Sequence, residues 1–396
     1  MGKPRILFAG AGIGGIVAAL ALLQRGFDVA LYEQAPELRE LGAGIQISPN
    51  GSRVLRALGL LPAMQAIASV PVAKEMRLFN TGQAWRVQDL GANAEACYGA
   101  PYWMVHRGDF HAVLVRTLAE RAPGAARVSA RCCSFEQSSD GVTLYLENGE
   151  LVYGDALIGA DGVHSNIRAQ LFGDAHARFT GFMAWRGVVP MERLPPRLHQ
   201  SYGMTWIGPH GHVVTYPLRR GELLNFVTAI ERGDWRVESW SEAGTVEECR
   251  RDLAAWHGDV LSIVDVIDVP YKWALLGREP LRHWSVGRVS LLGDACHPTL
   301  PFLAQGANMA IEDGMVLARC LDAYDVPEAL RRYEAARLDR TSRIVLGSLE
   351  NVSRYHNPQL ADPVQAQAFM AREFAPRAMG ARYDWLYEYD ALTVPI

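Results

Sequence analysis

Arg5-Ile6-Leu7-Phe8-Ala9-Gly10-Ala11-Gly12-Ile13-Gly14-Gly15 opens the chain with an apolar run followed by a glycine-rich turn. This order predicts a strand, a tight turn and a helix, the unit that binds a dinucleotide. Gly10 permits the turn, Gly12 lets the backbone approach a pyrophosphate, and Gly15 lets the helix pack on the strand. The N-terminus of the helix would then face the phosphates with the positive end of its dipole.

An acidic residue closes this unit. Glu33 ends the apolar run Val29-Ala30-Leu31-Tyr32, about 20 residues past the glycines, where a carboxylate can accept hydrogen bonds from ribose hydroxyls. We expect Gly14 and Gln34 to belong to the same binding site. A purely structural glycine turn is the alternative, but the strand, the helix and the acidic residue together favour dinucleotide binding.

Length and composition are those of an ordinary globular chain. Its 396 residues exceed one core of ordinary size and predict two or three substructures. Hydrophobic residues make up 49% and charged residues 21%, which is typical of a globular rather than a disordered or fibrous protein. The formal net charge of -4 leaves no excess of Lys or Arg for phosphates, so nucleic acid is not an expected partner.

The sequence also argues against export, membrane insertion and metal binding. Met1-Gly2-Lys3-Pro4 runs straight into the first predicted strand, so we expect no leader peptide. The sequence holds no run of about 18 apolar residues, and no membrane span is expected. The six cysteines show no CxxC or Cys/His ligand spacing, which predicts free thiols in a cytoplasm and no metal site.

The pattern of apolar, β-branched and aromatic residues changes along the chain, and it predicts an α/β fold with a discontinuous nucleotide-binding domain. Residues 1–72, 101–178 and 275–345 are expected to form one discontinuous, Rossmann-like nucleotide-binding domain. Residues 73–100 and 179–274 hold short β-branched and aromatic segments, which are typical of a mostly antiparallel sheet, here inserted as a second domain. Residues 346–396 are expected to be a C-terminal helical segment.

Shorter patterns predict individual elements. Helical spacing begins at about Ser52, after Val105-His106-Arg107, near residues 245–256 and at about Gly306. Residues 142–146 and 151–153 are predicted strands, joined by the hairpin turn Glu147-Asn148-Gly149-Glu150.

Two later segments make the nucleotide fold more specific. Residues 154–168 contain Gly159-Ala160-Asp161-Gly162, and residues 293–313 begin with Gly293-Asp294-Ala295-Cys296-His297-Pro298. Asp294 ends a buried apolar strand, a common place for ligand-binding groups in α/β sheets. Further on, Gly306-Ala307-Asn308 opens a helix whose free backbone N–H groups could bind an anion or a ring oxygen that carries negative charge.

With these three motifs in order, residues 5–340 resemble the single-component FAD-dependent aromatic hydroxylases, which include para-hydroxybenzoate hydroxylase. The similarity is greatest to the salicylate and 3-hydroxybenzoate 6-hydroxylase branch. The segments that carry this likeness are Gly42-Ala43-Gly44-Ile45-Gln46, Tyr216-Pro217-Leu218-Arg219-Arg220-Gly221-Glu222 and Leu303-Ala304-Gln305-Gly306. The resemblance implies a Rossmann-like FAD-binding domain, an inserted substrate domain and no separate NAD(P)H domain.

The resemblance also assigns residues to the cofactor. Asp294 would bond the ribitol chain of FAD, Arg107 would lie near the flavin, and Asp161 would serve both FAD and the nicotinamide nucleotide. The complete implied set is Gly10, Gly12, Gly14, Gly15, Glu33, Gln34, Arg107, Asp161, Asp294, Gly306, Ala307 and Asn308.

The implied reaction is hydroxylation of a small phenolic aromatic carboxylate, such as 3-hydroxybenzoate or salicylate, with NADH or NADPH and O2 as co-substrates. Reduced flavin would react with O2 to give a C4a-hydroperoxide, which the protein must keep dry. The protein must also draw off the phenolic proton, because a phenol with a pKa of about 10 is mostly neutral at pH 7 and the phenolate is the better nucleophile.

His212 is the first candidate for that base, with Tyr216 four residues later on the same predicted strand. Residues i and i+4 of a strand face the same side, and imidazole has a pKa suited to proton transfer at neutral pH. The resemblance to 3-hydroxybenzoate 6-hydroxylase, which has a His and a Tyr at this spacing, supports the assignment. Alternatively, His212 caps a surface hairpin at Pro209-His210-Gly211, and Tyr216 is a core aromatic.

The expected substrate contacts are Gln46, Gln305 and Pro301. Gln305 would orient a substrate hydroxyl or carboxylate, although a structural role in the loop is the alternative. Gln46 stands where a related hydroxynicotinate hydroxylase carries a histidine, so a pyridine substrate is less expected. Pro301 would shape the wall over the flavin, or only a turn.

Four further side chains have weaker cases. His297 is expected to pack beside the flavin without taking part in catalysis. Arg186, Arg219 and Arg220 are conceivable carboxylate partners, but solvated arginines are the favoured interpretation.

Other functions remain open at this stage. The same scaffold could oxidise a hydroxypyridine carboxylate or a non-phenolic or polycyclic substrate, and a flavin-binding sensor without turnover is the alternative from another class. A nicotinamide dehydrogenase would leave the Asp294 segment unexplained. The sequence does not fix the aromatic acid, the ring position, the choice between NADH and NADPH, or whether the protein is a monomer or a homodimer.

Overall fold

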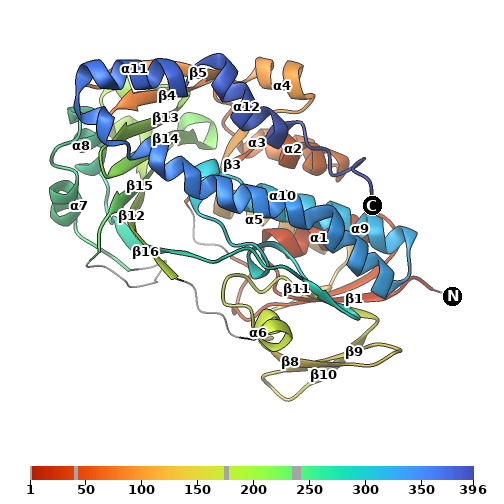
Figure 1. Ribbon diagram of the computed structural model, residues 1–396. Helices are drawn as coiled ribbons and strands as arrows, with labels where there is room; N and C mark the ends of the chain where they lie inside the picture. Colours follow the sequence, from red (N-terminus) through yellow and green to blue (C-terminus); the bar gives the residue numbers. More distant parts are fainter. Residues whose placement is uncertain (1, 40–42, 174–177, 234–241) are drawn as a thin grey trace.

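The computed structural model describes residues 2–39, 43–173, 178–233 and 242–396. Gly42, part of the motif that follows Glu33, lies outside these residues. Two large sheets dominate the molecule, and the long helix α10 (Val326–Tyr355) runs from the part that holds β1 towards the part that holds β14 (Figure 1).

The first sheet has the predicted Rossmann-like arrangement. Its strand order is β17-β18-β11-β1-β2-β7, and all neighbours except β17 and β18 are parallel. The apolar run in β1 is buried on both faces, as a central parallel strand requires. The strands are β1 (Arg5–Ala9), β2 (Asp28–Tyr32), β7 (Ala126–Arg127), β11 (Ala156–Gly159), β17 (Ser285–Val286) and β18 (Val289–Leu291).

Helices pack around this sheet. α1 (Ile13–Leu23) follows the glycine turn and packs against α5 (Arg107–Arg121) and α9 (Gly306–Ala323). The backbones of α1 and α9 approach closely, because a Cβ added at Gly314 would lie 2.8 Å from the backbone nitrogen of Ala18. The helices expected after Val105 and from Gly306 are confirmed.

The second large sheet has the order β16-β12-β15-β14-β13-β4-β5 and is mostly antiparallel, as predicted. The exception is the pairing of β4 with β13, which is parallel. The sheet domain boundaries themselves stay a prediction. The strands are β4 (Ala73–Leu78), β5 (Ala84–Asp89), β12 (Arg178–Pro190), β13 (Tyr202–Gly208), β14 (Gly211–Leu218), β15 (Leu223–Glu231) and β16 (Tyr271–Gly277).

The two faces of this sheet have different neighbours. On one face, Trp185, Trp206 and Phe226 pack with the short helices α7 (Val246–Asp252) and α8 (Gly258–Val264). Figure 1 shows both helices beside this sheet. The helical stretch predicted near residues 245–256 is observed as α7, whereas α8, which is capped by the side chain of His257, was not predicted. The other face carries Ala184 and Ala229, which pack with Phe302 in the turn η5 (Pro301–Leu303).

Smaller elements complete the fold. The hairpin expected over residues 142–153 is confirmed, and it belongs to a three-stranded sheet of β8 (Cys132–Gln137), β9 (Val142–Leu146) and β10 (Leu151–Gly154). β3 (Gly44–Ile47) pairs with β6 (Trp103–His106). The remaining helices are α2 (Pro49–Ala57), α3 (Leu61–Ile67), α4 (Ala92–Tyr98), α6 (Asn166–Phe172), α11 (Pro363–Glu373) and α12 (Pro376–Tyr387).

Two expected boundaries differ from the observed ones. α2 begins at Pro49, before the expected start at Ser52, because proline is favoured in the first turn of a helix. Residue 346, where the C-terminal helical segment was expected to begin, lies inside the continuous helix α10.

Candidate active site

The glycine turn has the geometry that a dinucleotide site needs. Gly10 has a φ of +101°, and an added Cβ would lie 2.4 Å from the carbonyl oxygen of Ala160. A Cβ at Gly15 would lie 2.6 Å from the carbonyl oxygen of Gly10. Gly12 is the N-cap of α1 and has no side chain to cover the first N–H groups of that helix. The turn therefore requires glycine, and it leaves helix donors available for a phosphate.

Glu33 lies beside the turn and has structural partners of its own. Its Oε2 accepts a hydrogen bond from the N–H of Ala11 at 2.9 Å, and its Oε1 accepts one from the N–H of Ala35 at 2.9 Å. Each carboxylate oxygen has a second lone pair, which a ribose hydroxyl would use. Gln34 is exposed next to it.

Three segments that are distant in the sequence meet at this turn. A Cβ at Gly10 would lie 3.1 Å from the Cα of Asp161, which follows β11. A Cβ at Gly14 would lie 2.5 Å from the side chain of Leu292, two residues before Asp294. The structure therefore brings the three sequence motifs to the same end of the parallel sheet, where Asp294 is exposed.

Asp161 has an incompletely satisfied carboxylate. Its Oδ2 accepts a hydrogen bond from the N–H of Ile167 at 3.2 Å, whereas its Oδ1 is buried and has no hydrogen-bond partner among the described residues. Burial raises the pKa of this carboxyl, although hydrogen bonds from Ser165 and the backbone oppose the shift. A buried oxygen of this kind is suited to a donor from a bound nucleotide.

The N-terminus of α9 lies against β3. The Oδ1 of Asn308 accepts a hydrogen bond from the N–H of Ser48 at 3.0 Å, and its Nδ2 donates to the carbonyls of Gln46 at 3.0 Å and Ala304 at 2.9 Å. These bonds occupy the Asn308 side chain. A flavin contact at this point would therefore come from backbone N–H groups such as those of Gly306 and Ala307.

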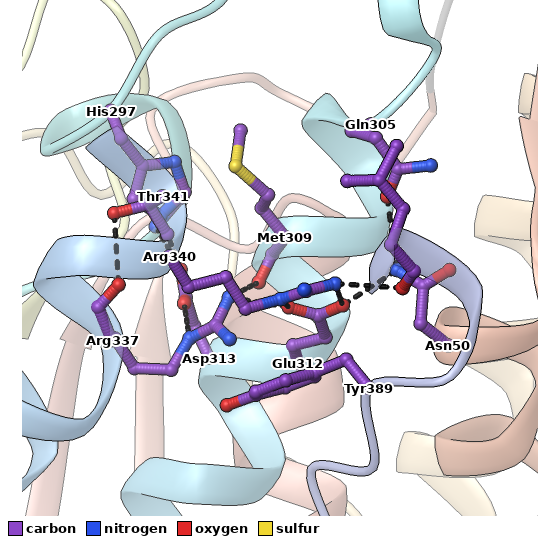
Figure 2. A network of polar contacts seen from close by, with 12 residues as sticks. Asn50, His297, Gln305, Met309, Glu312, Asp313, Arg337, Arg340, Thr341 and Tyr389 are labelled. Carbon is purple, nitrogen blue, oxygen red and sulfur yellow. Dashed lines mark hydrogen bonds and ion pairs between the residues drawn. The ribbon is translucent and has the colours of Figure 1, made fainter. Parts of the chain in front are cut away.

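A buried ionic network supports α9 from α10 (Figure 2). Arg337 Nη2 lies 2.7 Å from Glu312 Oε2, and its Nε lies 2.7 Å from Asp313 Oδ1. Arg340 Nη2 lies 2.8 Å from Glu312 Oε1. Burial alone would raise the pKa of Glu312, but Arg340 and Arg337 hold it below its ordinary value. The network therefore stays ionised inside the protein.

The network extends to the Asp294 segment. The Oδ2 of Asp313 accepts a hydrogen bond from the N–H of Gly293 at 3.1 Å and lies 2.6 Å from Nε2 of His297. Burial opposes ionisation of Asp313, but His297 and Arg337 lower its pKa. His297 thus acts as a structural partner of Asp313, and its expected position beside the flavin stays a prediction.

Gln305 belongs to the same network. Its Nε2 donates to Ser48 Oγ at 3.0 Å, and its Oε1 accepts a hydrogen bond from Asn50 Nδ2 at 2.9 Å (Figure 2 shows Gln305 and Asn50). Asn50 Nδ2 also donates to Glu312 Oε1 at 2.6 Å. Both polar ends of the Gln305 amide are engaged, so the structure favours the structural alternative over the expected substrate contact.

Tyr216 belongs to β14 of the second sheet, and its ring lies beside Gly44 of β3. It pairs in register with Asn225 of β15, whose Oδ1 accepts a hydrogen bond from the N–H of Gly44 at 2.7 Å. A Cβ added at Gly44 would lie 2.4 Å from the Tyr216 ring, so this approach requires glycine. Sequence reasoning missed Asn225, although a single amide inside the apolar run of residues 223–227 was an available signal.

His212 is buried and does not cap the hairpin. Its ring centroid lies 5.0 Å from that of Phe302 and 5.1 Å from that of Tyr355, and its Nδ1 lies 2.8 Å from Nε2 of His356. Burial, and next the neighbouring His356, lower the pKa of His212 well below its ordinary value. The imidazole is therefore neutral at pH 7, the form that can accept a proton.

The three arginines differ in their surroundings. Arg186 lies over the rings of Tyr271 and Trp273, at 5.7 and 5.2 Å from their centroids. Burial, and next the nearby Arg107, lower the pKa of Arg186. Arg186 is thus shielded by aromatic rings, which corrects the solvated interpretation. The other two, Arg219 and Arg220, are exposed as expected, and Arg219 pairs with Asp109.

Sequence reasoning also missed an aromatic cluster around Lys74. The Nζ of Lys74 lies 4.6, 5.5 and 5.9 Å from the ring centroids of Tyr102, Tyr383 and Tyr387. It donates to the hydroxyl of Tyr387 at 3.2 Å, and the hydroxyl of Tyr102 donates to Oε1 of Gln46. Burial lowers the pKa of Lys74 to about 7. These residues come from four distant segments, so no local pattern could have predicted the cluster.

Cys296, His297 and Asp313 are the group that most nearly resembles a metal site in the described part of the chain, with potential ligand atoms within 4.8 Å of one another. Asp313 is already paired with His297 and Arg337, and the guanidinium of Arg337 would repel a cation. This arrangement does not favour a metal. Within the described ranges, no helix has the length and apolar character needed to cross a membrane.

The sequence profile of a family described as FAD binding domain matches residues 4–348. The chain belongs to this family. This flavoprotein is 39% identical to 3-amino-4-hydroxybenzoate 2-monooxygenase of Streptomyces platensis, over 99% of this chain and 98% of that protein. It is 37% identical to 3-hydroxybenzoate 6-hydroxylase of Polaromonas naphthalenivorans, over 97% of this chain and 96% of that protein.

A solved structure agrees in fold over the whole chain. The salicylate hydroxylase substrate complex superimposes with a TM-score of 0.81 at 26% identity, covering 100% of this chain and 99% of the other. Together with the family, these relatives show that the flavoprotein is an FAD-dependent monooxygenase. The glycine turn, the unpaired Oδ1 of Asp161 and the N-terminus of α9 fit FAD.

Proposed function

We propose that this flavoprotein hydroxylates a small phenolic aromatic carboxylate, such as a hydroxybenzoate, and consumes NADH or NADPH and O2. The observation that carries the proposal is the environment of His212, whose imidazole is neutral and buried. It lies on the sheet face that packs with η5. The turn η5 directly precedes α9, the helix that we propose to face the flavin. Two relatives with hydroxybenzoates in their names support this substrate class.

FAD, when bound, accepts hydride from the nicotinamide and supplies the activated oxygen. We assign its binding to Gly10, Gly12, Gly14, Gly15, Glu33, Gln34, Arg107, Asp161, Asp294, Gly306, Ala307 and Asn308. For the last three residues the donors are backbone N–H groups, because the Asn308 side chain is already engaged.

His212 would accept the phenolic proton at Nε2, because its Nδ1 faces His356. Loss of that proton raises the electron density of the ring at the positions ortho and para to the oxygen. Phe302 and Tyr355 lie against the imidazole and keep water away from it.

The remaining contacts would orient the substrate. Tyr216 is fixed beside Gly44, and Gln46 is fixed by the hydroxyl of Tyr102, so both offer preorganised polar groups. Arg186 shares its sheet face with His212 and is the proposed partner of the substrate carboxylate. Pro301 is exposed at the start of η5 and would border the bound substrate.

The experiment that tests this proposal combines the purified protein with NADH or NADPH and a panel of acids. The panel holds hydroxybenzoates, aminohydroxybenzoates and hydroxypyridine carboxylates, and products are identified by mass. We expect one phenolic acid to accelerate nicotinamide oxidation and to gain one oxygen atom. Oxygen gain only with the pyridine acids, or with none, would refute the proposed substrate class.

We further propose a reducing, cytoplasmic location, because all six cysteines are free thiols in the structure. We propose that the protein is a monomer or a homodimer. Sedimentation of the purified protein distinguishes these two states.

A further inference from the structure

Three titratable side chains, those of His356, Glu231 and His210, connect His212 with the protein surface. His212 Nδ1 lies 2.8 Å from His356 Nε2, and His356 Nδ1 lies 3.5 Å from Glu231 Oε1. Glu231 Oε2 lies 2.7 Å from His210 Nδ1. The distances of 2.8 and 2.7 Å are those of hydrogen bonds. His356 Nδ1 is buried and has no hydrogen-bond partner among the described residues, so it must move closer to Glu231 before a proton can pass between them.

Exposure divides this series into a buried inner pair and a more exposed outer pair. His212 is 4% exposed, the side chain of His356 is 2% exposed, that of Glu231 is 41% exposed, and that of His210 is 73% exposed. The series therefore begins at the proposed base and ends in solvent.

Aromatic rings enclose the buried half of the series. Phe302 and Tyr355 flank His212, and Phe182 lies 5.3 Å from His356 between ring centroids. The hydroxyl of Tyr355 lies 3.3 Å from that of Tyr383, so this phenol is already engaged. Among these aromatic rings, the polar group that lies next to His212 Nδ1 is the imidazole of His356.

Few charged groups act on the two imidazoles. Glu231 raises the pKa of His356 and His210 lowers it, while burial keeps it at about 4. Arg354 and Arg382 act on the adjacent Tyr355. Both imidazoles are neutral at pH 7 and carry one N–H each, so a second proton that enters at His212 moves outwards to the carboxylate of Glu231 and to His210.

We propose that His356, Glu231 and His210 form a proton relay that carries the phenolic proton from His212 to solvent. The relay rests on the proposed function, because it needs a substrate that gives its proton to His212. The O–H bond of the phenol breaks and an N–H bond forms at His212 Nε2, while the proton on Nδ1 moves to His356 Nε2. The Nδ1 proton of His356 moves to Glu231 Oε1, Glu231 gives a proton from Oε2 to His210 Nδ1, and His210 releases its Nε2 proton to water, so Glu231 ends as a carboxylate and the number of protons is conserved.

A purely structural role is the alternative for the outer pair. The N–H of Glu231 donates to the carbonyl of His210 at 2.8 Å, and His210 has a φ of 65° in the hairpin turn. The side-chain contact therefore also holds this turn in place. The test needs a readout that a fixed turn would not change.

The variants are His356→Gln and Glu231→Gln, which keep polar groups of similar size but cannot relay a proton. His283→Gln is the matched control, because His283 is 75% exposed and lies 3.3 Å from Glu334, outside the relay. The substrate is the phenolic acid that the panel of acids under Proposed function identifies. Turnover is measured from pH 6 to 9 in H2O and D2O, with and without added imidazole.

For both relay variants we expect kcat to fall about tenfold, with flavin content and the KM for the acid unchanged. The solvent isotope effect should rise, and imidazole should restore the rate. His283→Gln should match wild type in every measurement. A wild-type pH profile and isotope effect in both relay variants would overturn the relay, as would a loss of rate that imidazole does not restore. Absence of hydroxylated product from wild type would instead overturn the proposed function.

Discussion

Replacing Arg337 with methionine tests the contribution of the buried ionic network to stability. Arg337→Met keeps an unbranched side chain of similar length but removes the ion pairs with Glu312 and Asp313, all three residues being 0% exposed. Removal of one partner of a buried ion pair costs roughly 3–5 kcal/mol. Glu312 keeps Arg340 and Asp313 keeps His297, so we expect a loss near the lower end, about 3 kcal/mol.

The assay is urea unfolding followed by tryptophan fluorescence, together with release of flavin fluorescence. Arg331→Met is the matched control on the same helix, because Arg331 is 67% exposed and pairs with Glu328. An exposed pair is worth about 0–1 kcal/mol, so the control should unfold almost like wild type. Flavin should also leave Arg337→Met at lower urea, because Asp313 holds the N–H of Gly293.

Acid unfolding provides an independent measurement. The pKa values of Glu312 and Asp313 are lowered in the folded protein. Their contribution to stability is therefore present above the unfolded pKa and is lost as the pH falls through the folded pKa. Without Arg337 both folded pKa values rise, so unfolding should begin at a higher pH. A free energy of unfolding within about 1 kcal/mol of wild type, with unchanged acid unfolding, would refute this account of the network.

Three further substitutions have defined outcomes. Gly10→Ala places a Cβ 2.4 Å from the carbonyl oxygen of Ala160, at a residue whose φ is +101°. The purified variant should therefore have lost most of its flavin absorbance. Normal flavin content would contradict the role of the turn. Because the pKa of Lys74 is about 7 in the folded chain and higher in the unfolded chain, the unfolded state binds more protons above pH 7 and wild-type stability should gain from rising pH. Lys74→Met should lose that gain in unfolding experiments from pH 7 to 9.5, and an identical pH dependence would show that the lysine is solvated. His212→Ala should keep its flavin but release hydrogen peroxide instead of hydroxylated product, and an unchanged product yield would remove His212 from the mechanism.

Sequence reasoning succeeded where short-range patterns carry the information. The strand, turn and helix around Gly10 and the start of α9 at Gly306 follow from apolar periodicity and from glycine stereochemistry within a few residues. The family resemblance implied that the three motifs serve one cofactor, and in the structure they meet because the ends of parallel strands lie at one edge of a sheet.

Sequence reasoning was incomplete where partners come from distant segments. Gln305 has a side chain that could bind a substrate, but its amide forms hydrogen bonds with Ser48 and Asn50, which lie 257 and 255 residues earlier in the chain. His356 is the partner of His212 from 144 residues away, and no spacing rule relates the two positions. Arg186 was misjudged because the aromatic rings that shield it belong to β16. Tertiary contacts of this kind decide the environment of a side chain but leave no local trace.

The parallel pairing of β4 with β13 has a consequence for how the chain is made in the cell. One edge of β4 pairs with β5, a few residues later in the chain, whereas its other edge pairs with residues 202–207 of β13. At translation rates of about 5–20 residues per second, the ribosome needs roughly 6–25 s to supply that partner. During this interval that other edge of β4 offers unpaired N–H and C=O groups to other nascent chains. Production of this flavoprotein should therefore respond to temperature and chaperone supply more strongly than its finished fold suggests.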